Sequence, residues 1–400
     1  MSDWRDQGMN IAWKSHPFCR KTLRKGFIMK IIRCFKVRSF ILAATLFAGL
    51  GFVTHAGAQA YLIDLESRTA TNLGALGGAS AYAYGINNIG QVVGESNKRA
   101  FITGPDGKGI RDLGTFGGSW SGASGINDAG RVVGHFYLQS GLFHAFATGP
   151  DGKAMSDLGT FGGDYSAAHA INSAGQVVGV ADAADNRLHA FITGPDGISI
   201  RDLGALYAFG INNAGQVVGS ALTPSGDIYP FITGANGAGI RDLGTLGGRG
   251  FLPAALDIND TGEVVGYSYT SEQHAHAFIT GPDGRGMRDL GTLYDNDIST
   301  ARAINNAGQV VGDSVRRFCD DPCGVPDTPH AFITGPNGVG MTDLNSLVDL
   351  PDGVILTSAE DINNAGQVIA NAIPEPQSYI MLLVGLALIG FTAGRKRLRP

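Results

Sequence analysis

Lysine is almost missing from the body of this 400-residue chain. Between residues 61 and 376 it occurs only at Lys98, Lys108 and Lys153. This stretch holds 16 Lys+Arg and 33 Asp+Glu, which gives 16 − 33 = −17, whereas the whole chain carries −5. Nucleic-acid binding needs clustered positive charge that neutralises phosphates. The composition therefore excludes nucleic acid as a partner and suits a soluble extracellular protein.

Cysteine is scarce as well. Of the four cysteines, Cys19 and Cys34 precede the predicted export cleavage site, and Cys319 and Cys323 lie in the insert RRFCDDPCGVPDTP. In an oxidising compartment, two cysteines four residues apart favour a local disulfide that stiffens the insert. A metal pair is the alternative, but no histidine or second cysteine pair stands nearby in the sequence.

Several catalytic signatures are absent. The chain has no G-x-S-x-G elbow, no HExxH and no EF-hand loop, and its GPDG turns lack the lysine spacing of a phosphate-binding loop. We therefore expect no enzymatic activity, no cofactor and no metal site.

What the chain does have is repetition. The phrase INNAGQVVG occurs at 211–219 and 304–312, and close relatives stand at 86–94, 126–134, 171–179, 258–266 and 362–370. The phrases HAFITGPDG and RDLGTLGG accompany it, except that AYLIDL at 60–65 replaces the first phrase in the first unit. Glycine is abundant, with 60 residues, yet 44% of the chain is hydrophobic. This combination predicts short strands joined by tight turns.

Each unit contains four strand-like segments separated by turn residues. HAFIT, the DLGTL segment, SxAxxI and QVVG have strand composition, and INNAGQVVG has the pattern of a hairpin. Val-Val and Phe-Ile put one apolar side chain on each face of a sheet, so each sheet needs neighbours on both sides. We expect an all-β fold, a β-propeller of seven four-stranded blades over 61–371 that closes into a ring. A β-solenoid is the alternative, although solenoid coils usually repeat faster.

The phrases HAFxT, DLGTLGG and INNAGQVVG resemble the HAF repeat family of bacterial extracellular proteins. The resemblance covers nearly all of 61–371 and implies secretion and a propeller-like fold, but no established activity. The departures are local, because the first unit lacks HAF, the fourth reads LGALYAFG and the seventh reads DLNSL.

The N-terminal residues predict export. Residues 29–60 have the order of a signal peptide, with Lys30, Arg33, Lys36 and Arg38 before an apolar run from 40 to 53. Cleavage is acceptable after Ala56-Gly57-Ala58 and after Ala58-Gln59-Ala60. A membrane helix is the alternative, but the run is short for a span. Residues 1–28 fit neither pattern, and we interpret them as an artefactual extension before a true start at Met29.

The C-terminal residues, 372–400, have three parts. Pro374-Glu375-Pro376 precedes an apolar run from 378 to 394, and a basic end with Arg395, Lys396 and Arg397 follows. This order resembles the PEP-CTERM sorting signal. The run predicts a short membrane helix with the basic end in the cytoplasm, and an ordinary tail anchor is the alternative reading. The resemblance implies an exosortase as partner, cleavage near the motif, and delivery to the cell surface or exopolysaccharide matrix of a Gram-negative bacterium.

Residues that recur in the units are more typical of a scaffold, because an active site needs asymmetry. The histidines that open the HAF segments could line a channel and bind metal, but structural hydrogen bonding is favoured: His144, His189, His276 and His330. The aspartates before Leu could do acid–base work or bind Ca²⁺, but turn bonding is favoured: Asp112, Asp157, Asp202, Asp242, Asp289 and Asp343. The asparagines after Ile are expected to start turns: Asn87, Asn127, Asn172, Asn212, Asn259, Asn305 and Asn363.

Non-repeated side chains are the better candidates for ligand binding. The candidates that follow the DLGT segments are Trp120, Tyr165, Tyr207, Arg249, Phe251 and Tyr294, and the insert at 313–329 is a further candidate. We expect them on one face of the ring, where aromatic rings can stack on sugars, and packing between blades is the alternative. The predicted function is non-enzymatic binding or structure at the cell surface, with exopolysaccharide as the candidate ligand. A carbohydrate-active hydrolase or lyase is the alternative.

Protein recovered from the cell surface is expected to be processed at both ends. Mass spectrometry of the intact protein should find an N-terminus near Gln59 or Tyr61 and loss of the tail near Pro376. Recovery of a chain that still runs from Met1 to Pro400 would contradict the export and sorting predictions together.

Overall fold

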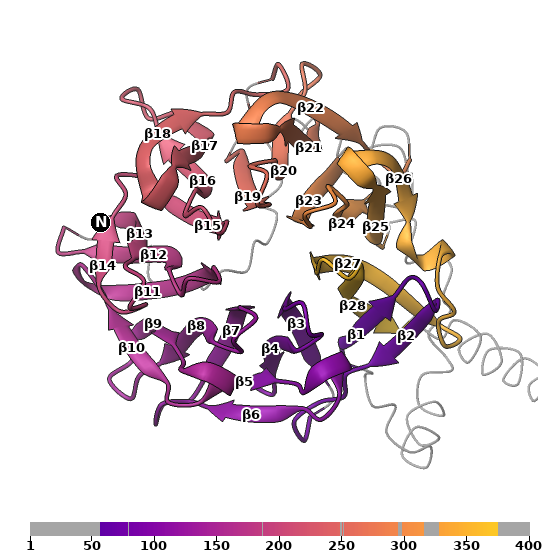
Figure 1. Cartoon of the computed structure of the whole chain (residues 1–400), viewed down its shortest axis with the longest axis horizontal. Coiled ribbons are helices and arrows are strands. Elements are labelled where there is room, and N and C mark those ends of the chain that lie inside the picture. Colours follow the sequence, from indigo (N-terminus) through magenta and orange to yellow (C-terminus); the bar gives the residue numbers. More distant parts are fainter. Residues whose placement is uncertain are drawn as a thin grey trace, which may run out of the picture. The chain divides into compact units, whose positions relative to one another are not determined.

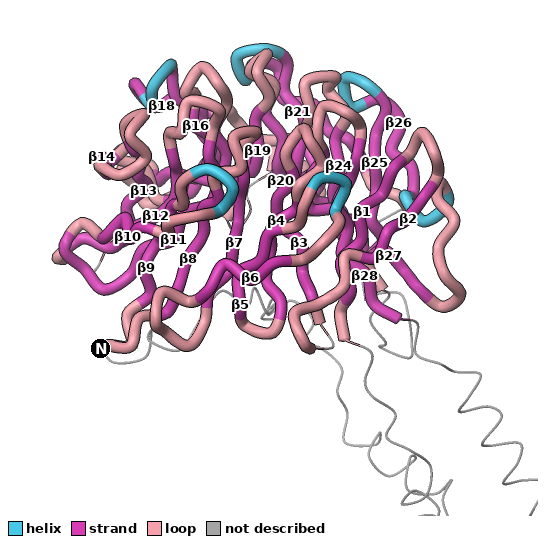
Figure 2. Tube along the Cα trace, turned by 60° about the horizontal axis from the view of Figure 1, so that its bottom comes forward, coloured by secondary structure: helices cyan, strands magenta, loops and turns pink. Residues whose placement is uncertain are grey.

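The computed structural model describes residues 57–374, apart from 79, 186, 249, 251, 295–297 and 316–327. The described residues form sheets arranged in a ring, and the strand that ends at the Ile of INNAGQVVG lies nearest the axis in each repeat (Figure 1). The helical segments drawn in Figure 2 are single 3-10 turns: η2 (Pro105–Gly107), η3 (Pro150–Gly152), η4 (Ala235–Gly237), η5 (Pro282–Gly284), η7 (Pro336–Gly338) and η8 (Leu344–Ser346).

Five separate sheets have four antiparallel strands each, which follow one another from the axis outwards. One contains β3 (Ala81–Ile86), β4 (Val92–Ser96), β5 (Arg99–Ile102) and β6 (Arg111–Gly114). A second contains β15 (Tyr207–Ile211), β16 (Val217–Leu222), β17 (Ile228–Gly234) and β18 (Ala238–Asp242). A third contains β19 (Ala254–Ile258), β20 (Val264–Tyr269), β21 (Ala275–Gly281) and β22 (Arg285–Gly291). A fourth contains β23 (Ile298–Ile304), β24 (Val310–Val315), β25 (His330–Gly335) and β26 (Val339–Asp343). The fifth contains β27 (Val354–Ile362), β28 (Gln367–Pro374), β1 (Gln59–Asp64) and β2 (Thr69–Asn72).

A sixth sheet has eight strands. It contains β7 (Ser121–Ile126), β8 (Val132–Tyr137), β9 (Phe143–Ala147), β10 (Ser156–Gly159), β11 (Gly162–Ile171), β12 (Val177–Ala183), β13 (Leu188–Thr193) and β14 (Ile200–Asp202). Within it two four-strand repeats are joined by one parallel pair, Phe143 with Tyr165. The predicted all-β propeller is confirmed. The prediction of seven separate four-stranded blades is wrong, because five sheets are separate and this contact joins the remaining eight strands.

The two ends of the described chain close the ring. β1 pairs antiparallel with β28, with Tyr61 opposite Ala370, and so the fifth sheet combines the first two strands with the last two (Figure 1). This pairing confirms the predicted closed ring and excludes the open solenoid. It also explains why AYLIDL replaces HAF in the first unit, because β1 takes the third position of the closing sheet. β1 starts at Gln59, so of the two predicted cleavage sites only the one after Ala58 leaves β1 whole.

Apolar pairs within the strands hold neighbouring sheets together. Val92 and Phe101 pack with Leu62, Leu73 and Ile369 of the closing sheet. Their chain neighbours Val93 and Ile102 point the other way and pack with Ala123, Ile126 and Val132 of the next sheet. All four side chains of the first sheet are at most 2% exposed. The alternation of side chains along a strand therefore gives each sheet two buried faces, as the sequence predicts.

The hairpin turn of INNAGQVVG packs against the GPDG-type turn of the same sheet. Gly308 has φ +71°, and its carbonyl accepts a 2.9 Å hydrogen bond from the Gly338 N–H. A Cβ placed on Gly308 would lie 2.7 Å from the backbone nitrogen of Asn337. Two constraints thus require glycine at this position, the left-handed backbone and the close approach of a second turn.

Replacement of Gly308 by valine is expected to destabilise the protein by roughly 1–3 kcal/mol, because a β-branched side chain resists this backbone conformation and would clash with Asn337. Gly340 also has φ +71°, but a Cβ placed on it would meet nothing within 4 Å. Gly340→Ala compared with Gly308→Ala therefore separates the backbone cost from the clash. Thermal unfolding checks both, and an equal loss of melting temperature in the two alanine variants would show that the close approach contributes nothing.

Candidate functional site

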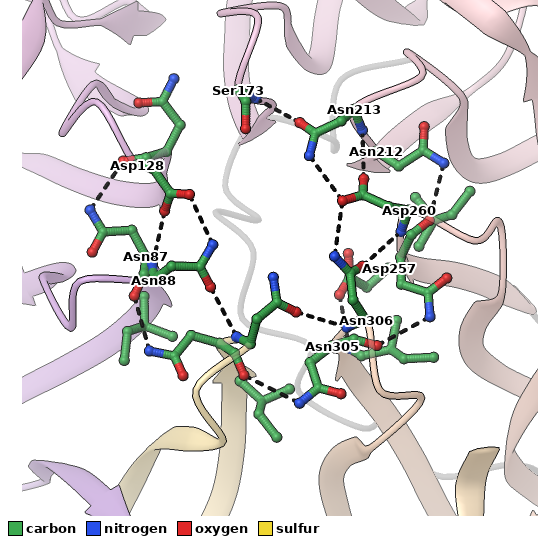
Figure 3. Close-up of a pocket in the computed structure, with 18 of the residues that line it drawn as sticks. Asn87, Asn88, Asp128, Ser173, Asn212, Asn213, Asp257, Asp260, Asn305 and Asn306 are labelled. Carbon is green, nitrogen blue, oxygen red and sulfur yellow. Dashed lines mark hydrogen bonds between the residues drawn. The ribbon is translucent and has the colours of Figure 1, made fainter. Parts of the chain in front are cut away.

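The asparagines of the INNAGQVVG turns form a closed ring of hydrogen bonds around the axis, of which Figure 3 shows a part. Each side-chain Nδ2 donates to the backbone carbonyl of the asparagine in the next repeat, over 3.0–3.2 Å. The order is Asn87, Asn127, Asn172, Asn212, Asn259, Asn305, Asn363 and back to Asn87. Each Oδ1 also accepts an N–H four residues ahead in its own turn, as in Asn305 with Gln309. The predicted turn role is correct, but the side chains also join every repeat to its neighbour.

The next residue of each turn forms a second, more exposed layer. Asn88 donates through its N–H and its Nδ2 to the two carboxylate oxygens of Asp128, both at 2.9 Å. Asp260 accepts from Asn213 and Asn306, and the Asn364 N–H donates to Asn88 Oδ1. Within the described residues, only the step from Asp128 to Ser173 lacks such a bond in this layer. The two layers line a polar pocket at this end of the axis, whose groups already satisfy one another (Figure 3).

Two carboxylates lie below the asparagine layers. Asp257 and Asp361 each accept the Ile N–H of the next sheet at 2.9 Å, from Ile304 and Ile86 respectively. The five other repeats have Gly or Ala at this position. Protein surrounds both carboxylates, although each keeps some surface toward the axis. Burial raises the pKa of Asp257 to about 7, and burial together with the charge of Asp257 raises the pKa of Asp361 to about 8.

The repeated histidines and aspartates lie in the two outer strands and bind each other. His144 Nδ1 is 2.8 Å from Asp157, and the same pair forms between His189 and Asp202, His276 and Asp289, and His330 and Asp343. The second aspartate oxygen accepts the N–H two residues ahead, for example Gly159 at 2.7 Å. The favoured structural roles therefore hold for both residue types. Within the described residues, no group of three or more His, Cys, Asp or Glu could hold a metal ion.

The structure brings together only part of the predicted ligand face. Tyr165 stacks on Phe143, with centroids 5.2 Å apart and planes 9° from parallel, and Trp120 contacts the same Phe143 at 5.4 Å. Tyr207 lies in the next sheet and acts electrostatically on the Tyr165 hydroxyl. Burial raises the pKa of Tyr165 to about 12. The predicted set of rings on one face is therefore a row from Trp120 through Phe143 to Tyr165.

The remaining predicted positions do not join this row. Tyr294 packs edge-on against His330 near the outer strands, with ring centroids 6.0 Å apart. Arg249, Phe251, Cys319 and Cys323 lie outside the described residues, and the disulfide stays a prediction.

Sequence reasoning missed a second set of non-repeated residues, those that directly follow QVVG. Pairing places them opposite the innermost strand of their sheet, as with Glu95 opposite Tyr82 and His135 opposite Gly122. The full set is Glu95, His135, Val180, Ser220, Tyr267, Asp313 and Asn371. Their variation within an otherwise constant phrase was the available signal.

One of these residues takes part in an ionic cluster near the axis. Arg302 donates from Nε to Asp313 at 2.5 Å and from Nη1 to Glu360 at 3.3 Å. Burial raises the pKa of Asp313 and the Arg302 charge lowers it, and because burial is the larger effect the pKa stays raised. One guanidinium thus serves two carboxylates, which leaves this cluster negative.

Residues 372–397 match the PEP-CTERM protein-sorting motif. The match confirms the predicted sorting signal. The residues predicted for it lie within the matched segment: Pro374, Glu375, Pro376, Arg395, Lys396 and Arg397. The motif implies processing by an exosortase and a place at the surface of a Gram-negative bacterium or outside it. The matched segment starts inside β28, which extends to Pro374. The HAF resemblance of the repeats stays a prediction.

No curated protein matches the chain. Among solved structures, a putative TolB from Agrobacterium tumefaciens gives a TM-score of 0.48 at 9% identity, over 79% of this chain and 98% of that one. TolB from Acinetobacter baumannii gives 0.40 at 12%, over 61% and 66%. A gluconolactonase from Xanthomonas campestris gives 0.39 at 12%, over 74% and 87%. Similarity at this level carries no argument about the activity of this chain.

Among the described residues, no helix has the length and apolarity needed to cross a membrane. The predicted signal peptide at 29–60 lies outside them except for its last four residues, and so does the membrane helix predicted within the sorting segment.

The free energy of unfolding is expected to fall by roughly 4–6 kcal/mol as the pH rises from about 5 to about 8. Asp257 and Asp361 have folded-state pKa values above their ordinary value, so the folded protein holds more protons than the unfolded chain in this range. The stabilisation is therefore present at low pH and lost as the pH passes the two folded-state values. Asp257→Asn with Asp361→Asn should flatten the dependence, since the amide oxygen still accepts the Ile N–H. Denaturant unfolding at several pH values checks this, and an unchanged slope in the double variant would contradict it.

Proposed function

We propose that this chain is an exosortase-processed surface protein whose propeller binds extracellular polysaccharide without transforming it. The row Trp120, Phe143 and Tyr165 carries the proposal. Its three rings are only partly buried and come from neighbouring repeats. Partly exposed aromatic faces offer apolar surface with a polar tip, which suits the apolar face and the hydroxyl rim of a sugar ring.

The repeated side chains are poor candidates for ligand binding, because they already take part in the fold. The repeated Asn, His and Asp side chains are occupied in turns, in the ring of hydrogen bonds and in pairs within a sheet. The side chains that break the repeat have no such scaffold role in common, and several gather near the axis. The sorting motif implies a protein at the cell surface or outside the cell, which supports an extracellular polymer as the ligand.

A binding assay with the bacterium's own exopolysaccharide tests the proposal. Affinity electrophoresis of the secreted protein should show retardation in gels that contain the polymer. Trp120→Ala and Tyr165→Ala should each weaken binding by about tenfold, through loss of stacking. Tyr294→Ala is the matched control, because Tyr294 is 38% exposed but lies away from the row. Retardation that is absent, or equal in all three variants, would overturn the proposal.

A carbohydrate-active enzyme is the second candidate, and Glu95 is the observation that favours it. Burial raises the pKa of this carboxyl beside the Trp120 indole, as a general acid requires. In that case the secreted protein should release reducing ends from the polymer, and Glu95→Gln should abolish the release. Polymer that is bound but not cleaved would rule this candidate out.

A further inference from the structure

Glu95 is a half-buried carboxylate without a salt bridge among the described residues. The Trp120 indole is its nearest donor and lowers its pKa, although no hydrogen bond of good geometry joins the two side chains. Glu95 lies in β4, opposite the innermost strand of its sheet. Lys98 lowers its pKa only as a more distant charge, and burial outweighs that effect. A half-buried carboxylate in this state is costly unless a positive group or a donor approaches it.

Aromatic side chains surround Glu95. Tyr82 is its cross-strand neighbour, and Tyr84 lies close enough for the Glu95 charge to raise the pKa of its hydroxyl, after burial as the main cause. The two tyrosines are 42% and 40% exposed, so this place is open to solvent. The indole Nε1 of Trp120 is buried without a hydrogen bond, yet it is near enough to favour the charged form of Glu95.

His135 completes the group from the neighbouring sheet. A Cβ on Gly122 would lie 2.8 Å from His135 Nε2 and 3.6 Å from Glu95 Oε2, so the two side chains flank the space that this glycine leaves empty. Burial lowers the pKa of His135 to about 4, so the imidazole is neutral and does not balance Glu95. Its Nε2 is buried without a partner, as is the Nε2 of His169, which acts on His135 electrostatically.

The charge of the surroundings selects the sign of a ligand. Arg302, the cation of the nearby ionic cluster, is already shared by Asp313 and Glu360. The body of the chain carries −17 between residues 61 and 376. A carboxylate in a setting of aromatic rings is the arrangement that recognises ammonium groups, through charge attraction and cation–π contact.

We infer that Glu95, Tyr82, Tyr84, Trp120 and His135 form a binding site for an amine-bearing sugar of a cationic polysaccharide. The inference rests on the proposed function and narrows its ligand class. The ammonium group lies against Glu95 and the exposed aromatic faces of Tyr82 and Tyr84. A polymer of uronic acids is disfavoured, because its carboxylates would meet Glu95, on which Lys98 acts only as a more distant charge.

Three oligosaccharide probes of equal length test the selectivity of this site: glucosamine, N-acetylglucosamine and uronic acid. Isothermal titration of the secreted protein should find that the glucosamine oligomer binds at least about tenfold more tightly than the acetylated oligomer. The uronic acid oligomer should not bind. Glu95→Gln should remove the preference for the free amine. Glu272→Gln is the matched control for non-specific attraction, since this exposed loop residue changes the net charge equally.

A second measurement separates the inference from the proposed function. Trp4, Trp13 and Trp120 are the three tryptophans, so the secreted chain keeps only Trp120, and its fluorescence reports on this site. Tetramethylammonium should change that fluorescence in the natural protein and in Glu272→Gln, but not in Glu95→Gln. If tetramethylammonium binds and no oligosaccharide does, the ammonium site stands and the polysaccharide function fails. Absence of the tetramethylammonium effect, or an amine preference that Glu95→Gln retains, overturns the inference.

Discussion

The hydrogen bond from an asparagine side chain to the next asparagine carbonyl is the contact on which the ring depends. It recurs at every INNAGQVVG turn and closes on itself between Asn363 and Asn87, 276 residues apart. Each amide has its donor and acceptor occupied in a site that excludes most water, where such bonds are strong and an unpaired group is costly. Removal of one asparagine side chain therefore leaves a backbone carbonyl of the next repeat unpaired. The nine-residue phrase recurs because its asparagine both closes a hairpin turn and links neighbouring repeats.

A scaffold held by repeated contacts can tolerate differences elsewhere. The innermost strand pairs with the second strand in the same way in every repeat. The residue after QVVG nevertheless differs in polarity, from the apolar Val180 to the charged Glu95. That position meets the innermost strand at the axis, so its variation creates one aromatic side near Trp120 and one ionic side near Arg302. The repeated residues thus build the scaffold, and the residues that differ between repeats form the candidate site.

Much of the fold could be predicted from the chain itself. Val92-Val93 and Phe101-Ile102 predict two buried faces, and the Asn-Asn-Ala-Gly turn predicts the hairpin, because both are local patterns. The joint between repeats could not be predicted, since the partner of Asn87 is 40 residues away and only the three-dimensional arrangement brings the two together. The count of separate sheets failed for a similar reason, because one parallel backbone pairing at Phe143 and Tyr165 joins two repeats into one sheet. The candidate site was found in part through Trp120, while Glu95 and His135 were missed because they directly follow the repeated phrase, away from the DLGT segments where candidates were sought.

Closure by β1 and β28 has a consequence for the order of events during export. The strand that leaves first pairs with the strand that leaves last, so Tyr61 and Ile63 emerge long before Ala370 and Val368 can cover them. Pairing across such a separation is slow, and an exposed edge strand is prone to aggregation in the meantime. The nascent propeller therefore stays an open arc until translocation is nearly complete. Because Ala372 to Pro374 belong both to β28 and to the sorting motif, completion of the arc and surface sorting act on the same final residues.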